Sequence, residues 1–187
     1  MGEDPHRASP SRSYSCRTCV YSFSRRFRQP VCQNDGKRGR CGEEDIGYDG
    51  HKKGKGRKRH LLVDTDGRVL KVFVSAADQN DREGARQVLT ECKGDYPRLG
   101  KIWADGQYTG WLIDWASETL GICLEVVLRS EDVRGFEVLP RRWVVERTFA
   151  WLGRYKRLAK DYELCPEHSE GMIYVAMTQM LLRRLAK

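Results

Sequence analysis

The chain has 187 residues, of which 40% are hydrophobic and 32% are charged, a composition that suits one globular domain or slightly more. No apolar run approaches the roughly 18 residues of a membrane-spanning helix, and the N-terminus has no apolar signal-peptide core. We therefore do not expect a membrane protein, a secreted disulfide scaffold or a collagen-like chain. There are 34 Lys and Arg against 26 Asp and Glu, and residues 1–60 carry the whole excess of +8. We expect a cytoplasmic globular domain behind a basic leader.

Residues 1–42 form the first segment. They are rich in Arg and Ser, with isolated aromatic residues and no helical or alternating period. Such a segment has too little apolar surface to offset the entropy of ordering the chain. We interpret it as a disordered or out-of-frame leader, followed by a domain over 43–187. The alternative is a zinc site, because the first two of its four cysteines have metal-ligand spacing: Cys16, Cys19, Cys32 and Cys41.

The rest of the chain alternates between strand and helix patterns. A turn sequence at 64–67 separates two β-branched runs and predicts a hairpin, and Asp81 opens a helix with acidic residues in its first turn. The expected elements are strands at 61–63 and 69–74, a helix from 81, a strand at 101–105, a helix at 111–120, a strand at 123–128, and helices at 143–160 and 169–185. This order predicts an α/β fold, a mixed sheet flanked by helices. Its first central strand, which should precede residue 59, is missing from the pattern.

Two acidic residues stand out as candidates for chemistry. Asp105 follows a predicted buried strand and begins a turn, which places its carboxylate at the edge where open α/β sheets bind ligands; a plain turn-forming Asp is the commoner alternative. Glu146 is the sole acid among seven Lys and Arg in residues 141–160, and Arg142 precedes it by four residues. A helix-capping role is the alternative for Glu146. An acid beside phosphate-binding arginines is also what a magnesium-dependent phosphoryl-transfer site needs.

Basic residues are expected to contact DNA, because clustered Lys and Arg release counterions from the phosphate backbone. The strongest cluster is the run from Gly50 to His60, for which a solvated loop is the alternative interpretation. The residues we expect to bind DNA are Lys52, Lys53, Lys55, Arg57, Lys58, Arg59, Arg142 and Arg154.

Four contiguous stretches of the sequence resemble the motifs of a known family. They are Gly47-Tyr48-Asp49-Gly50 with Gly56-Arg-Lys-Arg-His-Leu-Leu-Val-Asp64-Thr65, then Ala104-Asp105-Gly106-Gln-Tyr108-Thr-Gly110, then Pro140-Arg-Arg-Trp143-Val-Val-Glu146-Arg-Thr-Phe-Ala-Trp151. They are similar to the DDE transposases of the IS5 group, in the wider IS4-like class, over about residues 45–187.

The resemblance implies an RNase H-like fold in which three carboxylates hold two divalent metal ions, Mg²⁺ or Mn²⁺, for DNA strand cleavage and strand transfer. Asp105 matches the second catalytic Asp, Glu146 the catalytic Glu, and Arg142 the Arg four residues before it. The implied partners are double-stranded DNA, as the element's terminal inverted repeats and target, and a second copy in a homodimer. The implied location is the bacterial cytoplasm, at the nucleoid, without a membrane.

The first catalytic Asp is the missing element. The family carries it in a strand reading Asp-Ser-Gln-Ser-Val-Lys, and no such stretch occurs here. Codons can be chosen for residues 28–38 such that the same nucleotide string, read one base later, gives Asp-Ser-Gln-Ser-Val-Lys-Thr-Thr-Gly-Lys. We therefore hypothesise that residues 1 to about 40 are translated out of frame, which sequencing the DNA that encodes residues 20–50 would decide. Stand-ins for the lost Asp are Asp35, Asp45, Asp49 and Asp64. The alternative function is an inactive transposase remnant that only binds DNA.

Overall fold

The computed structural model describes residues 19–28, 45–50, 53–127 and 143–186, and within 19–28 it describes the backbone alone. The elements in chain order are β1 (Cys19–Arg28), β2 (Gly47–Asp49), β3 (Gly54–Val63), β4 (Val69–Ala76), α1 (Asp81–Asp95), β5 (Lys101–Ala104), the 3₁₀ turn η2 (Gly106–Tyr108), α2 (Trp111–Leu120), β6 (Cys123–Val126), α3 (Trp143–Leu152), α4 (Lys156–Ala159) and α5 (Pro166–Leu185). None of the described helices has both the length and the apolar composition that a membrane span requires.

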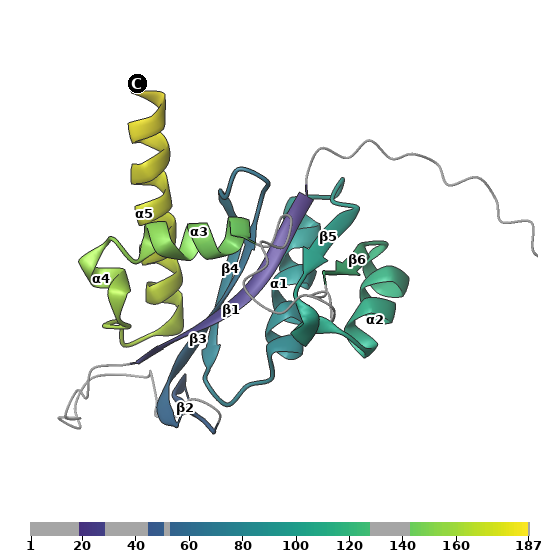
Figure 1. Ribbon diagram of the computed structural model, residues 1–187, viewed down its shortest axis with the longest axis horizontal. Helices are drawn as coiled ribbons and strands as arrows, with labels where there is room; N and C mark the ends of the chain where they lie inside the picture. Colours follow the sequence, from purple (N-terminus) through teal and green to yellow (C-terminus); the bar gives the residue numbers. More distant parts are fainter. Residues whose placement is uncertain (1–18, 29–44, 51–52, 128–142, 187) are drawn as a thin grey trace, which may run out of the picture.

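The strands form one mixed sheet in the order β2-β3-β1-β5-β6, with β4 also paired to β3 (Figure 1). Strand β3 runs antiparallel to β1, β2 and β4, whereas β5 runs parallel to β1 and β6. The mixed sheet flanked by helices that the sequence pattern predicts is therefore present.

Our expectation that the central strand is missing is wrong. Strand β1 lies between β3 and β5, pairing Tyr21 with Val63 on one side and Ser22 with Ala104 on the other. It falls inside the leader that we expected to lack structure. The strand was not predicted because the alternation of residue types is a weak signal where distant parts of the chain supply both neighbouring strands. The boundary between leader and domain at residues 42 and 43 stays a prediction.

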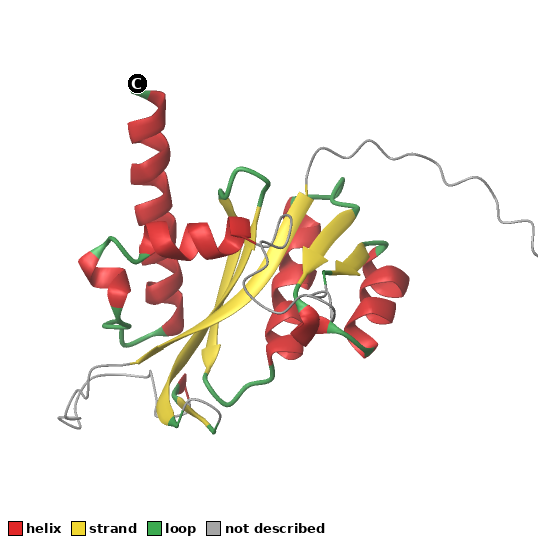
Figure 2. Cartoon of the chain, in the orientation of Figure 1, coloured by secondary structure: helices red, strands yellow, loops and turns green. Residues whose placement is uncertain are grey.

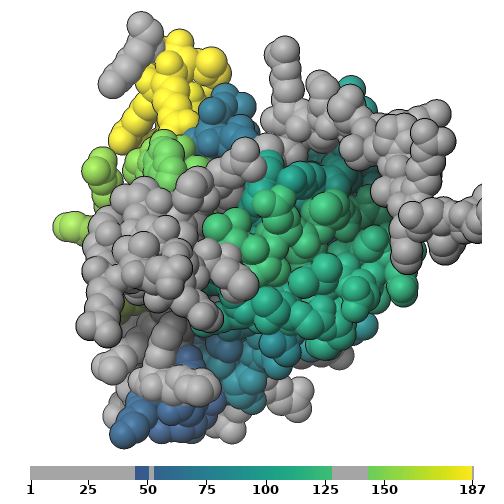
Figure 3. All heavy atoms as spheres, turned by 45° about the vertical axis from the view of Figure 1, so that its right-hand side comes forward, coloured from purple at the N-terminus to yellow at the C-terminus, as the bar shows by residue number. Residues whose placement is uncertain are grey.

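The helices cover the two faces of the sheet and bury two apolar clusters (Figures 1 and 2). Alternation along the strands divides the side chains between the faces: Leu62 and Ile102 point towards α1 and α2, whereas Leu61, Val63 and Trp103 point towards α3, α4 and α5. Figure 3 brings the first of these sides forward and shows the atoms of α1, α2 and β6 closely packed. Burial of these two clusters is what holds the layers together.

Most helix boundaries follow local sequence signals, with two differences from expectation. Helix α5 begins at Pro166 and not at residue 169; the second difference concerns the helix expected over 143–160. Helix α1 is capped by Asn80, whose side chain accepts from the Arg82 amide at 2.9 Å, and α2 ends at Gly121 in the left-handed conformation. The single helix expected over 143–160 is instead two, α3 and α4. Gly153 stands at the break, where glycine's freedom weakens a helix and the chain turns so that Leu158 returns to the core.

A buried histidine lies between the sheet and α1. The Nε2 atom of His60 is 2.8 Å from Ser75 Oγ, and its ring stacks on Phe73 with centroids 6.0 Å apart. Burial lowers the pKa of His60 from 6.5 to about 4, and the nearby Lys58 acts in the same direction, whereas Asp81 opposes it.

This depressed pKa predicts a loss of stability in mild acid. The unfolded chain binds a proton below about pH 6.5 while the folded domain keeps His60 neutral down to about pH 4. The free energy of unfolding is thus highest above pH 6.5. It decreases as the pH falls, and the decrease due to His60 reaches about 3 kcal/mol at pH 4. Urea unfolding at pH 7 and pH 5 measures this loss. His60→Gln, which does not titrate, should reduce the pH dependence; an unchanged slope would show that His60 is not responsible.

Candidate functional site

Asp105 lies at the carboxyl end of β5, beside the central strand. Its side chain is 6% exposed, and its Oδ1 atom accepts a hydrogen bond from the Gln107 amide at 2.9 Å. This bond caps η2 and fixes the direction of the carboxylate. The turn-forming role that the sequence left open is therefore real, and it places the carboxylate at the sheet edge where open α/β folds bind ligands.

Glu146 lies in the first turn of α3, and its side chain is exposed. The residues around it are buried on the sheet side of the helix, among them Val144, Val145 and Phe149. Because the apolar stripe of α3 faces the sheet, the acidic side chain remains on a face open to solvent. A carboxylate in that position can reach a ligand that binds from outside.

The sheet face and α3 bring the two candidate acids to the same side of the molecule. Trp103 and Val145 belong to one core cluster. Asp105 follows Trp103 by two residues in extended backbone, with φ −83° and ψ 175°, so it continues on the same face. Glu146 directly follows Val145. The two acids that the sequence singled out 41 positions apart thus lie on the α3 side of the sheet.

The described residues supply no third carboxylate to this site. Strand β1 has no Asp or Glu, and its register puts Phe23, the residue after Ser22, level with Asp105. Within the described ranges, no group of three His, Cys, Asp or Glu side chains is placed to hold a metal ion.

The proposed stand-ins for the first catalytic Asp have other places. Asp35 lies outside the described residues. Asp45 and Asp49 lie before and within the edge strand β2. Asp64 Oδ1 accepts from the backbone amides of Asp66 at 2.9 Å and Arg68 at 2.8 Å, so it is a turn residue.

Two of the expected DNA-binding residues are buried, and for them the expectation is wrong. Arg57 and Arg59 are 0% and 2% exposed, on the face of β3 that meets α4. Arg57 Nε lies 2.7 Å from Asp161 Oδ2, and Arg59 Nη2 lies 3.9 Å from Asp161 Oδ1. The basic run enters a strand there, so alternate side chains point into the protein and away from any DNA.

Backbone carbonyls accept further hydrogen bonds from the two arginines of this buried ionic cluster. Arg59 donates to Leu158 O at 2.9 Å and to Lys160 O at 3.3 Å, and Arg57 donates to Glu163 O. Burial lowers the pKa of Arg59 to about 10, an effect that Asp161 opposes. The Arg59 guanidinium therefore stays charged near neutral pH. Through these contacts, Arg57 and Arg59 fasten the segment after α4 to β3.

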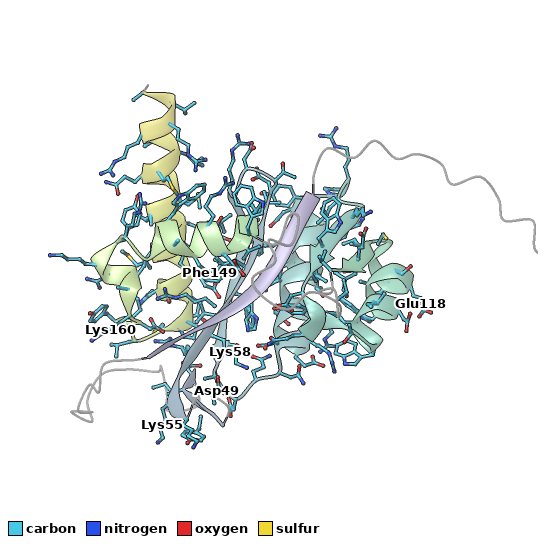
Figure 4. All side chains as sticks on the ribbon, viewed as in Figure 1. Asp49, Lys55, Lys58, Glu118, Phe149 and Lys160 are labelled. Carbon is cyan, nitrogen blue, oxygen red and sulfur yellow. The ribbon has the colours of Figure 1, made fainter. Side chains whose placement is uncertain are left out.

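The other expected DNA contacts divide between exposed and partly buried positions. Lys53, Lys55 and Arg154 are exposed. Lys58 is 15% exposed, and its Nζ lies 3.2 Å from Asp81 Oδ1, so it forms an ion pair with the first residue of α1. Figure 4 shows Lys55 at the β2 end of the sheet, away from Phe149 on α3. Lys52 and Arg142 lie outside the described residues, as do three of the four cysteines of the zinc alternative: Cys16, Cys32 and Cys41.

Sequence reasoning missed an arrangement of aromatic and basic side chains beside Glu146. The guanidinium carbon of Arg147 lies 4.3 Å from the ring centroid of Trp143 and 4.6 Å from that of Trp151, and Arg184 on α5 lies 4.5 Å from the Trp151 ring. The spacing of four residues along α3 was the available signal, since such residues share a helix face.

Comparison with known proteins agrees with this architecture. The family model described as a transposase DDE domain matches residues 25–181. No curated protein matches the chain in sequence. Among solved structures, a chain of the simian T-cell lymphotropic virus intasome in complex with PP2A regulatory subunit B56 gamma aligns with a TM-score of 0.52 at 14% identity, over 86% of this chain and 47% of that one. The Mos1 transposase paired-end complex with left transposon end gives a TM-score of 0.38 at 14% identity, over 86% and 55%.

The structural match and the family model support different conclusions, the first about the fold and the second about the family. The protein spans about half the length of the solved chains it matches, and the likeness to the intasome chain bears on the fold, where it confirms the expected RNase H-like α/β architecture. The family model covers most of the chain, including both Asp105 and Glu146. The protein therefore belongs to the family of transposase DDE domains.

Proposed function

We propose that this domain carries out DNA strand cleavage and strand transfer in DNA transposition, with Asp105 and Glu146 as carboxylates of its active site. The observation that carries the proposal is the placement of Asp105 at the carboxyl end of β5, on the sheet face that α3 covers, with Glu146 in the first turn of that helix. A metal-assisted phosphoryl-transfer site requires carboxylates that are held in fixed positions, and the end of a strand and the first turn of a packed helix both provide such positions.

The chemistry of these two residues fits a divalent cation. Mg²⁺ is commonly held in proteins by one or two carboxylates together with phosphates of the substrate, and Mn²⁺ accepts the same oxygen ligands. When bound, such an ion lowers the pKa of a water ligand and neutralises charge on the phosphoryl oxygens. Asp105 and Glu146 would supply two carboxylate ligands to one ion that is shared with the DNA. The second ion of the family's pattern needs a further acid, which the described residues do not provide.

Each residue then has a definite task. Asp105, oriented by the Gln107 amide, presents its carboxylate from a rigid strand end, and Glu146 presents a second from α3. Lys53, Lys55 and Arg154 are exposed and positive, and they would contact phosphates of double-stranded DNA, from the element's terminal repeats and from the target. Membership of the IS5 group, a homodimer and a location at the nucleoid in the bacterial cytoplasm belong to the same proposal.

A second candidate function rests on one observation. Strand β1 occupies the central position but reads Cys-Val-Tyr-Ser-Phe-Ser-Arg-Arg-Phe-Arg, without a carboxylate. A chain that keeps its basic surface and lacks one of three metal-binding acids would bind DNA and not cleave it. The out-of-frame hypothesis for residues 1 to about 40 leads to the same expectation.

One experiment, which measures both DNA nicking and DNA binding, distinguishes the two functions. We expect the wild-type chain to nick a supercoiled plasmid in Mn²⁺ or Mg²⁺ and to stop when the ion is chelated. Asp105→Asn and Glu146→Gln should each lower the nicking rate by about 100-fold or more, because removal of one preorganised group that stabilises transition-state charge costs that much. Gel-shift measurements should show DNA binding by both variants close to that of the wild type.

The control is Asp114→Asn, an exposed acid on α2, which should nick DNA at the wild-type rate. DNA binding without metal-dependent nicking by the wild-type chain would reject the enzyme and support the second function. Nicking that survives both Asp105→Asn and Glu146→Gln would show that the active site lies elsewhere.

A further inference from the structure

The turn between β3 and β4 is fastened to the helix that carries Glu146. The Oγ1 atom of Thr148 lies 3.0 Å from Gly67 O, and Arg147 Nη2 donates to Asp66 O at 3.1 Å. These contacts join residues 81 positions apart in sequence. They fall on the two residues directly after Glu146, so the turn holds the same helical turn that presents the acid.

Gly67 makes this close approach possible. It has a φ of +82°, a conformation that residues with a side chain rarely adopt. A Cβ atom at this position would lie 2.8 Å from Thr148 Oγ1 and 3.0 Å from Trp151 Cζ3. The turn therefore packs against α3 without space for a methyl group.

Arg147 is held on both sides by aromatic rings. Its guanidinium group lies between Trp143, one helical turn earlier, and Trp151, one turn later, at 4.3 and 4.6 Å from the ring centroids. A planar guanidinium can stack on two rings and still donate in its own plane, here to Asp66 O. Both its orientation and its distance from the turn are thereby fixed.

We propose that Arg147 is a positioning residue: the clamp formed by Arg147, Trp143, Trp151 and the turn at Asp66–Gly67 sets the direction of Glu146 towards the divalent ion shared with Asp105. This inference rests on the proposed function. Glu146 has a buried neighbour, Val145, on one side and the clamped Arg147 on the other, so the clamp governs the backbone from which its carboxylate projects. Outer partners of a metal-binding residue commonly change metal affinity by about 10- to 100-fold.

Metal binding distinguishes positioning from simple electrostatics. Arg147→Met removes a positive charge next to a cation site, and that change alone would strengthen binding of Mn²⁺. Positioning predicts the opposite, a dissociation constant for Mn²⁺ raised about tenfold. The dissociation constant is measured on the whole chain, without DNA, from the loss of the free Mn²⁺ signal in electron paramagnetic resonance. Arg147→Lys, which keeps the charge and a donor but not the planar stack, should show most of the same loss.

Two further variants distinguish a specific effect on Glu146 from misfolding or a general loss of stability. Gly67→Ala disturbs the clamp from the turn and leaves every charge in place, so it decides the question if Arg147→Met does not fold. Leu112→Ala opens a cavity in the other core cluster and lowers stability away from α3; it should bind Mn²⁺ as the wild type does. Equal Mn²⁺ affinity in the wild type, Arg147→Lys and Gly67→Ala would overturn the positioning role.

The proposed function can fail separately from the clamp. Glu146→Gln should weaken Mn²⁺ binding more than any clamp variant. If it binds Mn²⁺ as the wild type does, or if the wild type binds none, the site itself is wrong. If Glu146→Gln loses binding and the clamp variants keep it, the site stands and the positioning role of Arg147 is rejected.

Discussion

Asp161→Ala should destabilise the domain by about 3–5 kcal/mol, a large part of the 5–15 kcal/mol that holds a typical domain folded. Asp161 is 1% exposed and lies against two guanidinium groups that are themselves buried, Arg57 and Arg59. Removing the carboxylate leaves two positive charges in the interior without their acid, and the carbonyls of residues 158–163 compensate for them only in part. Urea unfolding followed by tryptophan fluorescence measures the change.

An exposed ion pair is the matched control for Asp161. Glu83 lies 3.0 Å from Arg86 on α1, and both side chains are more than 40% exposed, so Glu83→Ala should cost less than about 1 kcal/mol. Replacing all three buried groups by apolar residues, as Arg57→Met with Arg59→Met and Asp161→Leu, should recover much of the loss. An Asp161→Ala variant no less stable than Glu83→Ala would mean that the buried network contributes nothing.

Gly84→Ala should destabilise the domain by about 1–3 kcal/mol, although alanine is the better helix former. A Cβ atom at Gly84 would lie 2.3–2.7 Å from three atoms of the His60 ring. The ring cannot move away, because it is fully buried, hydrogen-bonded to Ser75 and stacked on Phe73. Either α1 must separate from the sheet or the histidine must give up its hydrogen bond.

The same helix offers the control for this substitution. A methyl group added at Gly94 would have nothing within 4 Å of it, so Gly94→Ala should stabilise the domain by about 0.5–1 kcal/mol through helix propensity alone. Thermal or urea unfolding compares the two. Combining Gly84→Ala with His60→Ala should cost less than the two separate losses together, because the methyl group then has space; strict additivity would show that the clash is not the cause.

The secondary structure was largely predictable because its signals are local. Turn residues at 64–67, the acidic first turn of α1 and the left-handed Gly121 each act within a few positions, and the hairpin, α1, α2 and β5 lie where they indicate. The break between α3 and α4 was not predicted, because a glycine inside an amphipathic pattern only weakens a helix. Whether the chain turns there depends on where Leu158 finds apolar surface.

The central strand was not predictable for a related reason. Strand β1 is paired through the backbone on both edges, to β3 and β5, and backbone hydrogen bonds do not depend on which side chains the strand carries. Its composition of arginine, serine and isolated aromatic residues therefore indicated a leader, whereas its pairing makes it the centre of the sheet.

Local periodicity and contiguous motifs were enough to predict the α/β class, the order of most elements, the family and the two acidic residues on which the proposed chemistry rests. The role of the basic run, in contrast, could be seen only in the folded chain. Lys53 and Lys55 remain exposed, whereas Arg57 and Arg59 turn inward to Asp161, a residue about a hundred positions later. A side chain's charge is a property of the residue, but whether that charge meets solvent, DNA or a buried carboxylate is set by the strand face on which the fold places it.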